Sequence, residues 1–215
     1  MNCLFLDIAS HEGTIALIGN EKVISKREVS TRVRDHELIP LVEECLEEAG
    51  WEYSDLTHLA CVIGPGGFTS LRVAVSYSNT IIDQLEVEGV GVHLSDLHEA
   101  RMCQDSESGI RNPDVLWLHA TKRDLMFVRG FGEYEEIWRE PTLISVDAFS
   151  QRIAAESRGF PLQWTGELLD SQKEALKELN LQEAELRSIE DILPKFVSGL
   201  TYVKKPLEPW YGRGF

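Results

Sequence analysis

The sequence predicts an α/β protein in two halves, each with a mixed β-sheet flanked by helices. Two observations lead to this prediction. Three short β-rich runs open the chain, and strand-like and helical segments then alternate, which is the order of an α/β domain. After a polar stretch the three-run pattern begins again, which indicates a duplicated and shortened second half.

The length also favours two domains, because 215 residues exceed the roughly 100 to 150 of a common single domain. Residues 104–114, "QDSESGIRNPD", are polar and contain Gly109 and Pro113, so they are the best candidate boundary. We therefore expect a first domain at 1–104 and a shortened second domain at 105–215.

The first domain is expected to begin with an antiparallel meander of the runs 2–9, 13–20 and 22–29. A helix follows at residues 36–49, with Asp35 as its N-cap and Gly50 as its end. Its apolar residues recur at helical spacing, and its glutamates lie on the other side. The apolar positions are Leu38, Val42, Cys45, Leu46 and Ala49.

A nearly all-apolar strand at 57–63 runs into a turn that contains Gly64, Gly66 and Gly67. The turn resembles a phosphate-binding loop, but it lacks the lysine and the paired hydroxyl of a P-loop. A helix, a strand and a short helix are expected next. Their ranges are 71–85, 87–94 and 96–102. Three strands, helix, strand, helix, strand, helix is the order of a ribonuclease-H-like domain.

In the second half, runs at 115–121, 124–131 and 134–141 repeat the meander, and a capped helix is expected at 145–156. Acidic helical segments are expected near 166–193. The tail from residue 201 mixes aromatic and basic side chains, among them Trp210. Stacking on RNA is one interpretation, and packing back on the protein or on a partner is the favoured one.

Composition excludes several classes of protein. Acidic residues outnumber basic ones 36 to 21, so a net charge of −15 opposes direct binding to a phosphate backbone. We found no membrane-length apolar stretch and no signal-peptide pattern, so we expect a cytoplasmic protein. The four cysteines form no Cys-x-x-Cys pair, which argues against a zinc or disulfide framework. They are Cys3, Cys45, Cys61 and Cys103.

Three stretches together resemble the TsaB (YeaZ) family: "LFLDIASHEGTIALI", "DHELIPLVEECLEEAG" and "DLTHLACVIGPGGFTSLRVAVSYSNTIIDQL". The resemblance covers about the first hundred residues. The second half resembles the family only in its element order and closing tail. The family turn reads Gly-Pro-Gly-Ser-Phe-Thr-Gly-Leu-Arg, and this chain departs from it at Gly67, Ser70 and Ala74.

The resemblance implies an actin-like (ASKHA) fold of tandem ribonuclease-H-like domains. It also implies a non-catalytic partner of the TsaD transferase that makes threonylcarbamoyladenosine (t6A) on tRNA. A TsaE-type ATPase and a second copy of the chain are further expected partners, and tRNA is expected to be contacted only indirectly. The positions Asp7, Gly64, Gly66 and Gly67 are then remnants of a phosphate loop, and no cofactor is expected.

The resemblance further implies that the two long helices of the first domain bind the partner. The expected partner-binding residues share one stripe on each helix. They are Leu38, Val42, Cys45, Leu46, Ala49, Leu71, Val75, Ser78, Ile82 and Leu85. A second stripe of the later helix contains Val73, Tyr77 and Ile81. One side of the later helix is expected to cover the sheet, and the alternative to a partner is that the helix at 36–49 alone covers its other side.

Two positions in the sequence are candidates for metal or nucleotide chemistry. His93 and His98 lie where TsaD relatives carry a metal-binding His-x-x-x-His pair, but a spacing of five residues separates their faces on a helix. We therefore expect exposed or capping histidines and no metal. Asp7 ends the first strand and is interpreted as a turn residue, although a weak nucleotide site stays open. The rival function is a stand-alone ATPase or metal-dependent transferase that uses Asp7 and His98.

Overall fold

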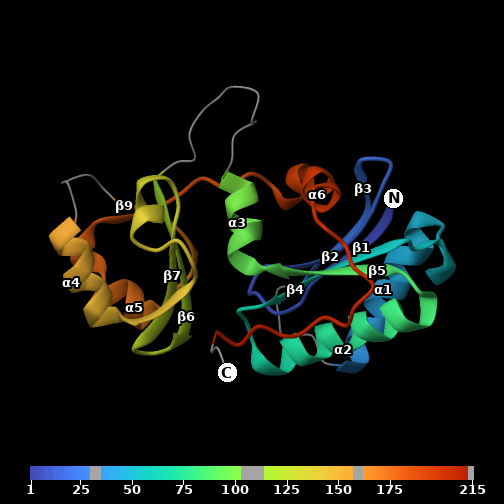
Figure 1. The fold of residues 1–215 in the computed structure, drawn as a ribbon, viewed down its shortest axis with the longest axis horizontal. Helices are drawn as coiled ribbons and strands as arrows, with labels where there is room; N and C mark the ends of the chain where they lie inside the picture. Colours follow the sequence, from blue (N-terminus) through green and yellow to red (C-terminus); the bar gives the residue numbers. More distant parts are fainter. Residues whose placement is uncertain (30–34, 103–113, 157–161, 213–215) are drawn as a thin grey trace. The chain divides into compact units, whose positions relative to one another are not determined.

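The computed structural model describes residues 1–29, 35–102, 114–156 and 162–212. The chain forms two compact units (Figure 1), of which the first contains residues 1–97 and 188–215 and the second contains residues 98–187. The expected boundary at 104/105 falls in a stretch outside the described residues. The segment from residue 188 onward, expected in the second domain, instead packs on the first unit.

The first unit contains a five-stranded mixed sheet in the order β3-β2-β1-β4-β5. β1, β2 and β3 are antiparallel neighbours, and β4 and β5 extend the sheet in parallel from β1. This is the ribonuclease-H-like arrangement that the element order predicts. The strands are β1 Asn2–Asp7, β2 Gly13–Gly19, β3 Lys22–Val29, β4 His58–Gly64 and β5 Glu88–His93.

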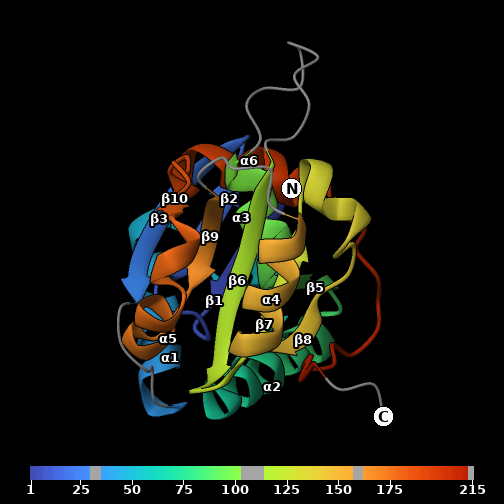
Figure 2. The same ribbon diagram turned by 90° about the vertical axis from the view of Figure 1, so that its left-hand side faces the viewer.

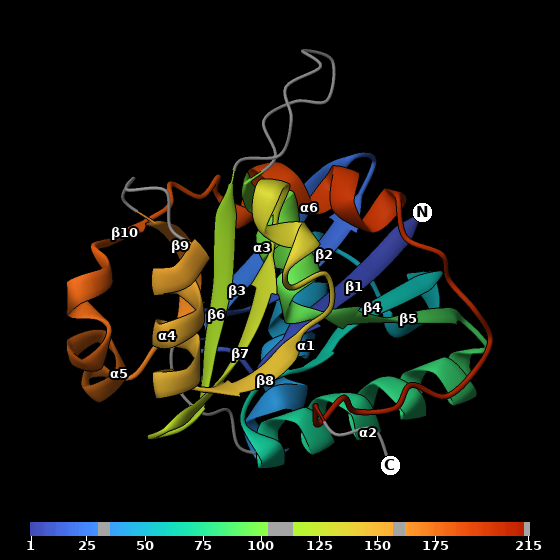
Figure 3. The same cartoon turned by 60° about the vertical axis from the view of Figure 1, so that its left-hand side comes forward.

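Helices cover both faces of this sheet. α1 and α2 lie on one face and α6 lies on the other (Figure 3). Gly50 ends α1 in a left-handed conformation with φ +67°, where the N–H of Trp51 reaches the carbonyl of Leu46 at 2.9 Å. The elements are α1 Asp35–Ala49, the 3-10 turn η1 Tyr53–Asp55, α2 Phe68–Leu85 and α6 Ile189–Ser198.

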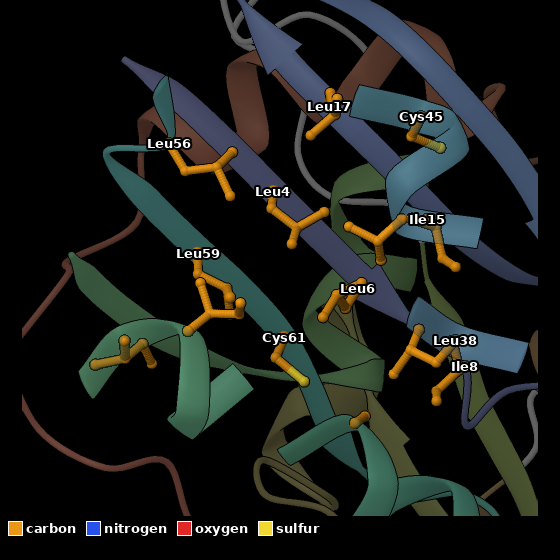
Figure 4. Packing of buried hydrophobic residues seen from close by; sticks show 14 of the residues in the cluster. Leu4, Leu6, Ile8, Ile15, Leu17, Leu38, Cys45, Leu56, Leu59 and Cys61 are labelled. Carbon is orange, nitrogen blue, oxygen red and sulfur yellow. The ribbon is translucent and has the colours of Figure 1, made fainter. Parts of the chain in front are cut away.

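Successive side chains of a strand point to opposite faces of the sheet, so every second residue of β1 and β2 lies under α1 and α2. Leu4 and Leu6 of β1, with Ile15 and Leu17 of β2, point to the same side and are fully buried. Figure 4 shows these side chains together with Leu38 and Cys45 of α1. The core of the first unit therefore lies between the sheet and this helix pair.

The second unit repeats the topology, because its sheet has the order β10-β9-β6-β7-β8. α4 and α5 lie over one face (Figure 2). Two ribonuclease-H-like sheets in one chain make the actin-like fold that the sequence predicts. The elements are β6 Val115–Lys122, β7 Leu125–Gly130, η3 Gly132–Glu136, β8 Thr142–Ser145, α4 Val146–Glu156, β9 Leu162–Glu167, α5 Asp170–Ala175, η4 Lys177–Leu179 and β10 Leu181–Glu183. The division between the units falls within α3 Leu94–Met102.

One expectation for the second half is wrong, and another is incomplete. The run 134–141 is not a strand, because the third strand of the meander comes later, as β8. The helical segments expected near 166–193 are present as α5, η4 and the start of α6, but the sequence did not predict the end of β9 or the strand β10 in the same stretch. β9 alternates buried Leu162 and Trp164 with exposed Gln163, but it is short and the charged residues around it conceal the period. Among the described residues, no helix combines the length and apolarity needed to span a membrane.

Candidate functional site

The stripe expected to bind a partner is buried inside the first unit. Eight of its ten residues are buried, including Val42 at 0% and Val75 at 4% exposure, and only Ala49 and Leu85 are partly exposed. They pack on the sheet because an amphipathic helix first buries its apolar side against its own domain. The expectation that this stripe is an exposed surface is therefore wrong for the free chain.

The surface between α1 and α2 is formed by other residues, which we name the helix seam: Ile39, Glu43, Tyr53, Val73 and Tyr77. Ile39 and Glu43 lie one turn apart on α1, and Val73 and Tyr77 lie one turn apart on α2. Ile39 is 46% exposed and Glu43 is also exposed, while the other three are half-buried.

The sequence did reveal part of the helix seam. Val73 and Tyr77 belong to the second apolar stripe of α2, which helical spacing in the sequence distinguishes from the first stripe. Ile39 and Tyr53 were missed. Ile39 lies off the main stripe of α1 and would have been noticed as an apolar residue on its charged side. Tyr53 lies in η1 and has no periodic signal.

Two tyrosine hydroxyls meet in the helix seam. The Oη atoms of Tyr53 and Tyr77 are 2.9 Å apart and share a hydrogen bond. Burial raises the pKa of both hydroxyls, and the Glu43 carboxylate raises both further. Both groups are therefore neutral at physiological pH and act as hydrogen-bonding groups.

The charges of α1 divide between its two sides. Arg27 of β3 pairs with Glu48 at 2.6 Å and with Glu44 at 3.5 Å. Glu43 and Glu47 are exposed, and within the described part of the chain neither forms an ion pair. Among the described residues, the side of α1 away from β3 therefore presents negative charge that no ion pair neutralises.

The glycine turn is packed against the chain itself. Gly64 has φ +147°, and a Cβ added there would lie 2.3 Å from the carbonyl oxygen of Trp210. A Cβ on Gly66 would lie 2.6 Å from the carbonyl oxygen of Ala9, and the N–H of Gly67 donates to that oxygen at 3.2 Å. These glycines are thus needed for close contacts within the chain.

The carboxylate of Asp7 accepts hydrogen bonds from the turn that follows β1. This carboxylate is 1% exposed and accepts hydrogen bonds from the backbone N–H groups of Ala9 and Ser10, both at 3.2 Å, and from the Ser10 hydroxyl. Burial raises the pKa of the Asp7 carboxyl, and these bonds oppose the rise. The structure agrees with the interpretation of Asp7 as a turn residue.

The C-terminal tail packs on the first unit, as the favoured interpretation of the sequence predicted. Val203 bridges to Gly89 at the edge of β5 through two backbone bonds of 3.0 Å. The Asn79 side chain accepts from the N–H of Leu207 at 2.7 Å and donates to its carbonyl at 3.0 Å. The Trp210 ring meets the His93 ring edge-on at 4.4 Å between centroids. Residues 213–215 lie outside the described part.

The two histidines have different roles. His93 precedes α3, and its Nδ1 accepts the N–H of Ser95 at 3.2 Å, so the expected capping role is confirmed. His98 is only 9% exposed, and its Nδ1 lies 2.8 Å from Thr165 Oγ1, so the expectation of an exposed or capping residue is wrong. Burial lowers the pKa of His98 to about 3, helped by Arg101 and His119.

Within the described ranges, neither the possible metal ligands nor the cysteines form a metal-binding site. In those ranges no three His, Cys, Asp or Glu side chains are grouped so as to hold a metal ion. Cys3, Cys45 and Cys61 are buried free thiols, as expected for small apolar residues, and Cys103 lies outside the described residues.

The chain was compared with known proteins. Residues 26–157, more than half of the chain, match the family model of TsaD, tRNA N6-adenosine threonylcarbamoyltransferase. The tRNA threonylcarbamoyladenosine biosynthesis protein TsaB of Buchnera aphidicola is 24% identical over 58% of this chain and 55% of that protein. The Neisseria gonorrhoeae tRNA N6-adenosine threonylcarbamoyltransferase is 31% identical over 60% of this chain and 36% of that protein. The chain thus spans about half, or less, of the curated relatives' length.

Two solved structures from Pseudomonas aeruginosa share the fold over nearly the whole chain. One is described as an uncharacterized protein with similarity to peptidase YEAZ, with TM-score 0.69, 19% identity and 99% coverage of both chains. The other is YeaZ, with TM-score 0.63, 19% identity and coverage of 92% of this chain and 93% of that one. The two solved structures show the shared fold. The family model, which covers more than half of the chain, and the Buchnera relative show that the chain belongs to the TsaD/TsaB (YeaZ) family.

Proposed function

We propose that this chain is a non-catalytic subunit of tRNA threonylcarbamoyladenosine biosynthesis, which binds and positions a TsaD-type transferase subunit. The observation that supports the binding role is the helix seam. α1 and α2 already bury one side on their own sheet, and the seam between them still presents apolar and aromatic side chains to solvent.

Two helices that lie on the same face of a sheet with such a seam suit a second helix pair. The ridges and grooves of two helices can receive those of two others, and half-buried residues such as Val73 and Tyr77 would lose their remaining exposure on association. A TsaD-type subunit is the proposed occupant because the chain's relatives include both TsaB proteins and transferases.

The two residues of the rival enzyme hypothesis are engaged in structural contacts. His98 is buried, neutral and bonded to Thr165, and the carboxylate of Asp7 is occupied by the turn that follows it. These contacts support a subunit that acts by binding. Because the chain carries a net charge of −15, we propose that tRNA is held by the partner. As a separate point, we propose that the complex works in the cytoplasm.

Co-purification with the transferase subunit encoded in the same genome tests the proposal. The wild-type chain is expected to retain the transferase. Val73→Glu is expected to lose it, because a carboxylate in the buried centre of an interface is costly to desolvate.

Leu143→Glu is the matched control, since Leu143 is a 39% exposed apolar residue on β8 of the second unit. It should still co-purify with the transferase, and circular dichroism should show both variants folded. Normal retention of the transferase by folded Val73→Glu would contradict the proposed surface. Pairing with a TsaE-type ATPase and pairing with a second copy of the chain stay predictions.

A further inference from the structure

The centre of the helix seam is polar, although its flanks are apolar. Two tyrosine hydroxyls together offer two O–H donors and four acceptor lone pairs. The single bond between Tyr53 and Tyr77, 2.9 Å long, uses one donor and one lone pair. One donor and three acceptor positions remain, so the pair can accept more hydrogen bonds than it can donate.

Glu43 adds negative charge at the same place. It is exposed and has no ion pair within the described residues, and it lies one helical turn from Ile39. Its carboxylate interacts electrostatically with both tyrosine hydroxyls. The helix seam therefore combines two apolar side chains, Ile39 and Val73, with a centre that is negative and rich in hydrogen-bond acceptors.

We propose that Glu43, Tyr53 and Tyr77 form the specificity-determining spot of the helix seam, which receives a guanidinium or ammonium group from a helix of the protein partner. A cation of this kind carries only donors, so it matches the acceptors that remain. This inference rests on the proposed function, whose partner it characterises more closely.

Charge favours a different protein over a second copy of this chain as the occupant. A second copy would bring its own Glu43 toward the Glu43 of this chain, and both chains carry a net charge of −15. Like charges that face each other in an interface oppose association, whereas a basic partner helix would be attracted and correctly placed.

The test measures the dissociation constant of this chain with the transferase subunit from the same genome, at low and high salt. Glu43→Gln keeps the shape and removes the charge, so it should weaken binding about tenfold and make binding less sensitive to salt. Tyr53→Phe combined with Tyr77→Phe should weaken binding by a similar factor. Glu47→Gln, an exposed glutamate one turn along α1 and outside the helix seam, is the control and should bind like wild type.

A charge swap makes the test specific. Glu43→Arg should bind far more weakly, and substitution of one basic residue by glutamate on the transferase should restore binding to this variant only. If Val73→Glu abolishes binding while Glu43→Gln and Glu47→Gln both bind normally, the inference fails and the proposed function stands. If all three variants bind normally, the helix seam is not the interface, so the inference and the proposed binding surface both fail although the chain still binds the transferase. Self-association of the wild-type chain that Glu43→Gln weakens would overturn the inferred occupant.

Discussion

The backbone N–H of Trp210 donates a 2.7 Å hydrogen bond to the carbonyl oxygen of Ile63, which ties the C-terminal tail to the end of β4. The next residue, Gly64, faces the carbonyl of Trp210 so closely that a side chain has no room. The glycine turn, whose sequence resembles a phosphate loop, is thus shaped at this position by a contact with the chain's own tail.

Substitution of Gly64 should therefore destabilise the protein. In Gly64→Ala the Cβ would lie 2.3 Å from the Trp210 carbonyl oxygen, at a φ of +147° that L-residues rarely adopt. We expect a loss of about 3 kcal/mol or more in urea denaturation. Gly50→Ala is the control, since Gly50 also has positive φ but has nothing within 4 Å of the added Cβ, and it should cost only about 1 kcal/mol. Equal losses would show that the tail contact does not matter.

Asn79 should hold the tail on α2. Asn79→Ala removes both hydrogen bonds to Leu207 and should destabilise by about 1–3 kcal/mol, because two backbone groups lose their partner. Hydrogen exchange at Leu207 and Trp210 should speed up more than exchange in β1. Gln84→Ala, at an exposed position of the same helix, should change neither quantity. Unchanged exchange in Asn79→Ala would mean that the tail is held by its other contacts.

The two sides of α2 should respond differently to a charge. Val75→Glu places a carboxylate in the core of the first unit, where Val75 is 4% exposed, and should cost several kcal/mol or prevent folding. Val73→Glu lies in the half-exposed helix seam and should cost about 1 kcal/mol. Urea denaturation followed by circular dichroism compares the two. A Val75→Glu variant as stable as Val73→Glu would contradict the burial of the first stripe.

His98 should make stability depend on pH. An unfolded histidine has a pKa of about 6.5, whereas the folded pKa of His98 is about 3. The unfolded state therefore binds the extra proton between these values. The stabilisation present above pH 6.5 is lost as the pH falls, by about 1.4 kcal/mol per pH unit.

His98→Asn removes this titration and keeps a polar partner for Thr165. Its free energy of unfolding should fall less steeply than that of wild type between pH 6.5 and 4, as measured by urea denaturation at several pH values. All other titrating groups are common to both proteins. Parallel curves would show that His98 titrates normally in the folded state.

The pure chain should neither hydrolyse ATP nor transfer a threonylcarbamoyl group. The two residues of the enzyme hypothesis are engaged elsewhere, Asp7 by Ser10 and His98 by Thr165. Phosphate release and tRNA modification should equal those of a heat-inactivated control. Activity above that background which Asp7→Ala abolishes would support the rival function of a stand-alone enzyme.

Much of the fold could be predicted from the sequence because its signals are local. The three opening strands are β-rich runs separated by turn residues, the helix at 36–49 has a clear period of 3.6 residues, and Gly50 ends that helix where expected. The pattern of three β-rich runs begins again after residue 114, and this repeat predicted the second sheet. β10 could not be predicted in this way, since three residues are too few to show a period.

The functional surface depended on tertiary structure. Periodicity showed that Leu71, Val75 and Ile82 share one side of α2, but it could not show which element covers that side. The sheet covers this side of α2, so the helix seam that stays exposed consists of other residues, such as Ile39 and Val73. Tyr53 contributes to the same seam from the separate turn η1. The sequence by itself determined the elements, their order and their amphipathic sides. Only the tertiary structure decided which of those sides stays exposed. The reason is that burial of a side depends on contacts with the sheet, the other helices and the tail, whose residues are far apart in the chain.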